Sequence, residues 1–169
     1  MKYIKFFILF GLLASFSANA ILEVNIIKSK EDSFPIVIAP FKFIGDSKGS
    51  VDIAKIIRDN LNRSGQFNAL STNELIDNQI DFNFWQEHKK DAVVFGKIEQ
   101  VSSKVFNIYI YIYDVLTQKA LYQKKIAVHN SGFRRIAHYL SDKIYYVLLG
   151  QKGSFDTRLS YVTVSDNKS

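Results

Sequence analysis

The chain has 169 residues, which suits one domain with a sizeable core and leaves little room for a second. It contains no cysteine, so a disulfide framework and a cysteine nucleophile are both excluded. The formal net charge of +6 comes from lysines and arginines that are spread along the chain with acidic residues between them, which is typical of a solvated surface.

Residues 1–20 have the pattern of a secretory signal peptide. Lys2 and Lys5 form a positive start, Phe6–Leu13 is apolar, and small residues up to Ala20 complete an A-x-A cleavage pattern. The apolar core is too short for a transmembrane span, so we expect cleavage after Ala20 and no membrane span in the mature chain, with an uncleaved anchor as the alternative. Exported proteins rarely meet nucleic acid, so we expect none as a partner. An anionic envelope surface or an acidic partner is the second interpretation of the basic excess.

The first part of the mature chain predicts two strands and a helix. Leu22–Ile26 alternates like a short strand, and the apolar run Pro35–Phe41 is typical of a strand buried on both faces. Ser50 is placed to cap a helix that runs to about Arg63.

The middle of the chain gives weaker signals before another buried strand. Gln66–Leu70 is expected to be extended, and Ser71–Glu74 has the capping-box spacing, which predicts a short helix through Ile76. Phe82–Lys90 is a second weak helical stretch, and its Phe84 and Trp85 are expected to anchor the core rather than to form a binding platform. Asp91–Ile98 has the composition of a buried strand.

The clearest alternation in the chain puts isoleucines on one face of a strand and tyrosines on the other. The isoleucines are Ile108, Ile110 and Ile112, and the tyrosines are Tyr109, Tyr111 and Tyr113. Three tyrosines in a row could form a ligand-binding face. We favour the structural interpretation, because tyrosine commonly half-buries its ring in a strand and keeps its hydroxyl in water. A hairpin connection then leads to a strand over Ala120–Val128.

The C-terminal part of the domain predicts an amphipathic helix that begins near Phe133. Its apolar residues recur at helical spacing, Ser131 is placed as the N-cap, and Gly150 follows where a left-handed residue costs glycine little. With the preceding elements, this predicts an α/β (α+β mixed) fold in which a mixed β-sheet is covered by about three helices.

The sequence contains no catalytic constellation with a specific spacing. It has no phosphate-binding glycine loop, no Gly-x-Ser-x-Gly elbow and no histidine pair at metal-ligand spacing. His138 and Asp142 lie four residues apart on the polar face of the last helix, where a base and its orienting carboxylate, a surface pair or a brace would all look alike. With no nucleophile nearby, we expect no enzymatic activity, no cofactor and no metal.

The polar residues of the C-terminal stretch carry a specific resemblance. The pattern consists of Arg135-Ile136-Ala137-His138, Ser141-Asp142, Tyr145, Leu149-Gly150, Lys152-Gly153, Phe155, Thr157-Arg158 and Tyr161-Val162. Upstream, Pro35-Ile36, Pro40-Phe41, Ser64-Gly65, Trp85, Asp91–Val94 and Gly96 agree in order. Together these segments resemble the N-terminal domain of the TolB family, the periplasmic β-propeller proteins of the Tol–Pal system, over essentially the whole mature chain.

The resemblance implies a division of the chain. We expect a signal peptide at 1–20, a partner-binding strand and linker at 21–33, a TolB N-terminal-like α/β domain at 34–158, and at 159–169 the start of a β-propeller that this chain does not contain. In the family the propeller binds Pal, so Pal is expected as a partner only if a propeller is present.

The resemblance also implies two groups of site residues. In the family the first mature residues bind the C-terminal domain of TolA, which assigns that role here to Leu22, Glu23, Val24, Asn25, Ile26 and Ile27. A short extended segment can add to a sheet edge through its main chain, and the alternative is that it pairs within its own domain. An interdomain junction is expected at Arg135, His138, Asp142 and Arg158.

The function implied is that of a non-enzymatic periplasmic interaction module that serves outer-membrane integrity and cell division. The alternative is a small periplasmic ligand-binding module built on the face of Tyr109, Tyr111 and Tyr113.

Overall fold

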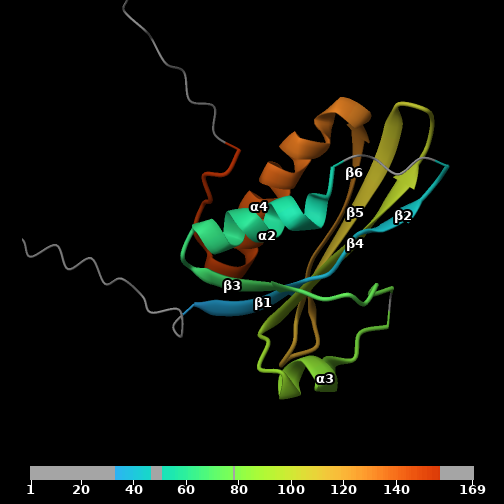
Figure 1. Ribbon diagram of the computed structural model, residues 1–169. Coiled ribbons are helices and arrows are strands. Elements are labelled where there is room, and N and C mark those ends of the chain that lie inside the picture. The colour runs from blue at the N-terminus through green and yellow to red at the C-terminus, as the bar shows by residue number, and fades with distance from the viewer. Residues whose placement is uncertain (1–32, 47–50, 78, 157–169) are drawn as a thin grey trace, which may run out of the picture.

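The computed structural model describes residues 33–46, 51–77 and 79–156. They form one mixed sheet of six strands in the order β3-β1-β4-β5-β6, with β2 also paired to β4 (Figure 1). The strands are β1 (Phe34–Ile38), β2 (Lys42–Ile44), β3 (Phe67–Ser71), β4 (Ala92–Gln100), β5 (Val105–Asp114) and β6 (Ala120–His129). The helices are α2 (Ile53–Arg63), α3 (Phe82–Glu87) and α4 (Phe133–Leu149). The predicted α/β fold with a mixed sheet and three helices is therefore confirmed.

One half of the sheet is parallel. β1 lies between β3 and β4 and runs parallel to both, so that Ile36 faces Ala69 on one side and Ala92 on the other. Its residues Ile36, Val37 and Ile38 are fully buried, as the predicted strand between the two prolines requires. β2 is a three-residue strand that the apolar pattern did not predict.

The other half is an antiparallel meander of β4, β5 and β6. Ile108, Ile110 and Ile112 of β5 are completely buried on the face that α2 and α4 cover, which confirms the predicted alternation. Because Gly96 of β4 has no side chain, the backbone of Tyr109 on β5 and the ring of Phe41 can lie close to it. A Cβ at this position would lie 2.3 Å from the carbonyl oxygen of Tyr109 and 2.4 Å from the ring of Phe41.

The two long helices lie side by side on one face of the sheet (Figure 1). Asp52 caps α2, since its Oδ1 accepts from the backbone N–H of Lys55 at 3.0 Å, whereas Ser50 lies outside the described residues. Gly150 ends α4 in the left-handed conformation at a φ of 70°, as predicted.

The predicted N-cap of α4 was wrong. Gly132 occupies that position without a side-chain hydrogen bond, because a short 3-10 turn, η2 (Asn130–Gly132), precedes the helix and includes Ser131. The Ser131 hydroxyl instead lies 3.0 Å from Nδ1 of His129.

The short helix predicted after Ser71 was also wrong. Ser71 ends β3, and residues 72–76 form no helix. The Thr72 hydroxyl accepts from the backbone N–H of Glu74 at 3.1 Å, which makes a tight turn out of the residues that were expected to form a capping box.

A second, smaller apolar cluster fills the opposite face of the sheet. Val37, Val93, Phe95 and Val115 meet Trp85 of α3 there, which confirms Trp85 as a core anchor. The same prediction was wrong for Phe84, which is 36% exposed. Among the described residues, no helix is both long enough and apolar enough to span a bilayer.

Candidate functional site

The predicted TolA-binding strand, Leu22 to Ile27, lies outside the described residues, and so does Arg158 of the predicted junction. The other three junction residues, Arg135, His138 and Asp142, all project from α4. They contact different neighbours, so their roles are described separately.

His138 belongs to a polar network between the two long helices. Its Nδ1 lies 2.9 Å from Nδ2 of Asn60 on α2, and the same amide nitrogen donates to the hydroxyl of Ser141 at 2.9 Å. Ser141 in turn donates to the carbonyl of Ala137 at 2.8 Å. Asn60 and Ser141 are 1% and 0% exposed, so the network satisfies polar groups inside an otherwise apolar helix interface.

The direction of each bond in this network is determined by its donors. Arg63 donates to Oδ1 of Asn60 at 2.6 Å, which leaves Nδ2 as the group that faces α4. Because Nδ2 donates, Nδ1 of His138 must accept, and the ring proton of the neutral imidazole is on Nε2. The histidine is thus a brace between the two helices.

Asp142 holds the segment that follows α4. Its Oδ1 accepts from the backbone N–H of Phe155 at 2.9 Å, and its Oδ2 accepts from that of Asp156 at 3.1 Å. Gly153 packs against the same carboxylate so closely that a Cβ there would lie 2.3 Å from Oδ1. His138 and Asp142, which lie one turn apart, therefore use separate partners and do not form the pair that their spacing allows.

A line of aromatic rings continues this attachment to the edge of the sheet. The ring of Phe155 packs edge-on against Tyr145 at 5.8 Å, and Tyr145 packs against Phe67 of β3 at 5.6 Å. The segment after α4 is therefore fixed both by a carboxylate and by ring contacts, up to the last described residue, Asp156.

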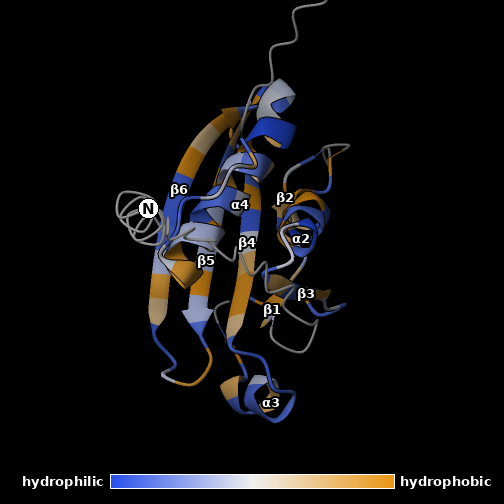
Figure 2. Ribbon diagram, turned by 90° about the vertical axis from the view of Figure 1, so that its left-hand side faces the viewer, coloured by the Kyte–Doolittle hydropathy of each residue, from blue (hydrophilic) through white to orange (hydrophobic). Residues whose placement is uncertain are grey.

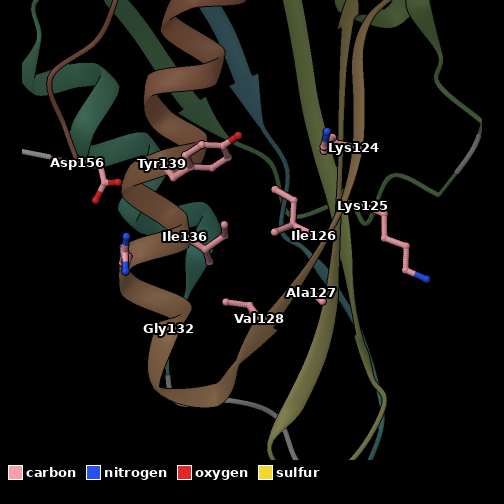
Figure 3. Close-up of a pocket in the computed structure, with 10 residues that line it drawn as sticks. Lys124, Lys125, Ile126, Ala127, Val128, Gly132, Ile136, Tyr139 and Asp156 are labelled. Carbon is pink, nitrogen blue, oxygen red and sulfur yellow. The ribbon is translucent and has the colours of Figure 1, made fainter.

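Arg135 lines a groove between α4 and β6. The groove has a volume of about 590 Å³, and Figure 3 shows Ile126 and Val128 pointing from β6 toward Ile136 on α4. The predicted junction residues thus divide among a helix brace, an attachment for the following segment and a surface groove.

The tyrosine face of β5 does not form an open binding site. Tyr111 and Tyr113 stack on Phe95 with ring centroids 5.0 and 5.9 Å apart, and Phe82 covers Tyr113 at 5.9 Å. The cavity beside Tyr111 has a volume of only about 80 Å³. Small-molecule sites usually have about 300 Å³ or more, so these two rings belong to the second apolar cluster.

Tyr109 has a charged environment instead. Its hydroxyl donates to Glu99 at 2.9 Å, and the ammonium groups of Lys97 and Lys125 lie 4.4 and 5.4 Å from its ring centroid. This part of the sheet surface is basic, and it lies next to β6.

The other two histidines, His88 and His129, form hydrogen bonds with residues close to them in the sequence. Nδ1 of His88 lies 2.7 Å from the carbonyl of Phe84, and His129 contacts Ser131 at the start of η2. Within residues 33–46, 51–77 and 79–156, no three His, Asp or Glu side chains are grouped so that they could hold a metal ion.

Comparison with known proteins supplies the family. Residues 22–121 match the family model described as the TolB amino-terminal domain, which is more than half of the chain. The chain belongs to the TolB family. The Tol-Pal system protein TolB of Ruthia magnifica subsp. Calyptogena magnifica is 54% identical over 149 residues, which is 88% of this chain and 35% of that protein. The TolB of Vesicomyosocius okutanii subsp. Calyptogena okutanii (strain HA) is 50% identical over 145 residues, 86% of this chain and 34% of its own.

A solved TolB structure agrees with the fold. The crystal structure of TolB from Acinetobacter baumannii aligns with a TM-score of 0.61 at 33% identity, over 74% of this chain and 31% of that chain. The chain therefore spans about a third of the length of the TolB proteins that it matches. It corresponds to the N-terminal domain of TolB.

Asn60 and Ser141 are site residues that the sequence reasoning missed. Each is a polar residue within an apolar helical stripe, Asn60 between Ile57 and Leu61 and Ser141 between Leu140 and Ile144. One polar residue in the stripe of each of two adjacent helices is the signal that could have identified the pair.

Proposed function

We propose that this chain is a non-enzymatic interaction module of the Tol–Pal system in the periplasm, where it serves outer-membrane integrity and cell division. The observation that carries the proposal is membership of the TolB family, together with relatives named Tol-Pal system protein TolB. The proposed partner is the C-terminal domain of TolA, and Pal becomes a partner only together with a propeller. The geometry of the tyrosine face gives the ligand-binding alternative no support.

The proposed TolA-binding element is the segment of Leu22 to Ile27. Its alternating residues suit addition to a sheet edge, in which main-chain hydrogen bonds provide affinity and side chains on one face provide specificity. Leu22, Val24 and Ile26 share one face of such a strand, and Glu23, Asn25 and Ile27 share the other.

A titration of the mature protein against the isolated TolA C-terminal domain tests this assignment. We expect saturable binding that is lost when residues 21–27 are deleted. Replacing Val24 and Ile26 together with Asp should weaken binding strongly, whereas Lys30→Ala, outside the proposed binding strand, is the control. Binding that is unaffected by the deletion would refute the assignment.

We further propose that Arg135, His138 and Asp142 of α4, together with Arg158, form the junction toward a following domain. The hydrogen bonds that Asp142 accepts from the backbone of Phe155 and Asp156 support this proposal, because they set the direction in which the chain leaves α4.

We also propose that the chain is exported and cleaved after Ala20. The intact mass of the protein recovered from the periplasm tests this cleavage. A mass that retains residues 1–20 would contradict it.

A further inference from the structure

The two edges of the sheet differ in how their backbone groups are satisfied. At the β3 edge, the side chain of Asn62 binds both backbone groups of Ala69, donating to its carbonyl at 2.9 Å and accepting from its N–H at 2.7 Å. The amide of Asn62 therefore occupies the place of a neighbouring strand at the middle residue of β3.

The β6 edge has no such cover among the described residues. β6 is the last strand of the sheet order and lies at its margin (Figures 1 and 2). The backbone N–H of Asn130 donates to the carbonyl of Lys104 at 2.9 Å, which places the hydrogen-bonded pairs with β5 at Val128, Ile126 and Lys124. The intervening residues, Gln123, Lys125 and Ala127, consequently direct their N–H and C=O groups away from the sheet.

The two faces beside this edge are chemically different. Toward α4, Ile126 and Val128 of β6 form the apolar side of the groove with Ile136 and Tyr139 (Figure 3). On the opposite face, the ammonium groups of Lys125 and Lys97 lie over the ring of Tyr109. The hydroxyl of the same tyrosine donates to Glu99, so this face carries two lysines against one carboxylate. A strand added at this edge would thus meet an apolar surface with one set of alternate side chains and a basic surface with the other.

We propose that the outer edge of β6 binds an extended segment of a partner protein as an additional strand, and that apolar and acidic residues alternate in this segment. Its apolar side chains enter the groove against α4, and its acidic side chains face Lys125. Lys124 and Arg135 add positive charge at the groove, against the single carboxylate of Asp156.

A second copy of the chain is a poorer occupant of the same edge. In an antiparallel pair of two β6 strands, Lys124 and Lys125 would lie near the same lysines of the other copy, and like charges on paired strands are destabilising. Lysines on an edge strand are a known means of preventing such self-pairing. The charge therefore favours an acidic partner.

The probe is a labelled nine-residue peptide of alternating valine and glutamate, titrated against the full chain by fluorescence anisotropy. We expect saturable binding that weakens as salt is added, and no binding of the peptide in which lysine replaces glutamate. Two further peptides carry N-methyl groups, one on the valines and one on the glutamates. Only one of them should bind, because only alternate N–H groups of an added strand face β6.

Protein variants test the edge itself. Ala127→Pro removes an outward N–H without removing a bond to β5, whereas Ala127→Ser keeps that N–H and is the matched control. Lys125→Glu should weaken binding roughly tenfold, and Lys89→Glu, an exposed lysine beyond α3, should have no effect. Far-ultraviolet circular dichroism confirms that each variant is folded.

Three outcomes would overturn the proposal. The first is equal binding by Ala127→Pro and Ala127→Ser. The second is binding of the valine–glutamate peptide only after deletion of residues 21–27, which would assign the edge to the chain's own segment. The third is a dimer in analytical ultracentrifugation that Lys125→Glu stabilises. The first and the third outcome have no bearing on TolA binding by Leu22 to Ile27, which has its own test.

Discussion

Asn60 on α2 and Ser141 on α4 are bonded to each other at 2.9 Å, although 81 positions separate them in the chain. Both side chains are almost completely buried, so their bond is formed where water cannot replace it. Replacing either partner therefore leaves a polar group unsatisfied inside the helix interface.

Asn60→Ala should destabilise the domain by about 2 kcal/mol in urea unfolding, because Ser141 and His138 both lose their donor. Ser141→Ala should cost less, since it removes one acceptor. In a double-mutant cycle the two changes should be less than additive, as expected of residues in one network. Fully additive effects would show that the two residues act independently.

Asp142→Ala should loosen the segment after α4. The change removes both acceptors for the backbone N–H groups of Phe155 and Asp156, and we expect a loss of about 1–2 kcal/mol. Amide hydrogen exchange should accelerate at these two residues. The amide of Gly150, which donates to Tyr146 at 2.9 Å, should remain protected and serves as the internal control. Equal acceleration at all three amides would indicate general unfolding and contradict the assignment.

Gly96→Ala should be among the most damaging small substitutions in the sheet. The new methyl group would collide with the carbonyl of Tyr109 on β5, and backbone atoms cannot move aside as a side-chain end can. We expect a loss of at least about 2 kcal/mol in thermal or urea unfolding. Gly65→Ala is an instructive comparison, because nothing lies within 4 Å of that Cβ position and its cost should come from the φ of 71° alone. A smaller effect at Gly96 than at Gly65 would be inconsistent with the packing.

Asp91 should make stability fall as the pH rises through the acidic range. Burial, and next the charge of Asp114, raise the pKa of Asp91 above its ordinary value of 3.8, while Lys90 opposes the shift. Below 3.8 both the folded and the unfolded state carry the proton. As the pH rises through the folded-state pKa, the folded state must lose a proton that it binds more tightly, so this contribution to stability disappears.

Asp91→Asn should accordingly stabilise the protein at pH 7 and flatten this part of the stability profile. Urea unfolding between pH 3.5 and 7 measures both effects. Glu87→Gln, which also removes one carboxylate but at an exposed position in α3, is the control. A decrease in stability at pH 7 for Asp91→Asn would show that the charged carboxylate is stabilising.

The elements with strong periodicity could be predicted from the sequence. The alternation at Ile108, Ile110 and Ile112 gave a buried face of β5, and the apolar stripe after Phe133 gave α4 with its left-handed end at Gly150. The parallel half of the sheet follows less directly, because pairing of β1 with β3 and β4 joins segments that are distant in sequence. β2 is too short to show any period.

The wrong predictions concern local hydrogen bonds with competing solutions. The Thr72 hydroxyl forms a turn with Glu74 where a capping box was expected, and Ser131 enters a 3-10 turn where an N-cap was expected. The side-chain contacts of the candidate site could not be predicted from spacing either. The spacing of His138 and Asp142 suggested a mutual contact, but each bonds to a residue that only the tertiary fold brings near, Asn60 for one and Phe155 for the other.

The amide of Asn62 has a consequence for stoichiometry. Sheets of many copies can pair into a continuous sheet only if each copy has a free edge at both ends of its own sheet. Asn62 occupies the middle of β3 at one end of the strand order β3-β1-β4-β5-β6, so a strand added at an end of this order must join β6. Complexes formed through β6 should therefore stop at one added strand for each chain, and fibres that grow by pairing β6 with β3 should not form.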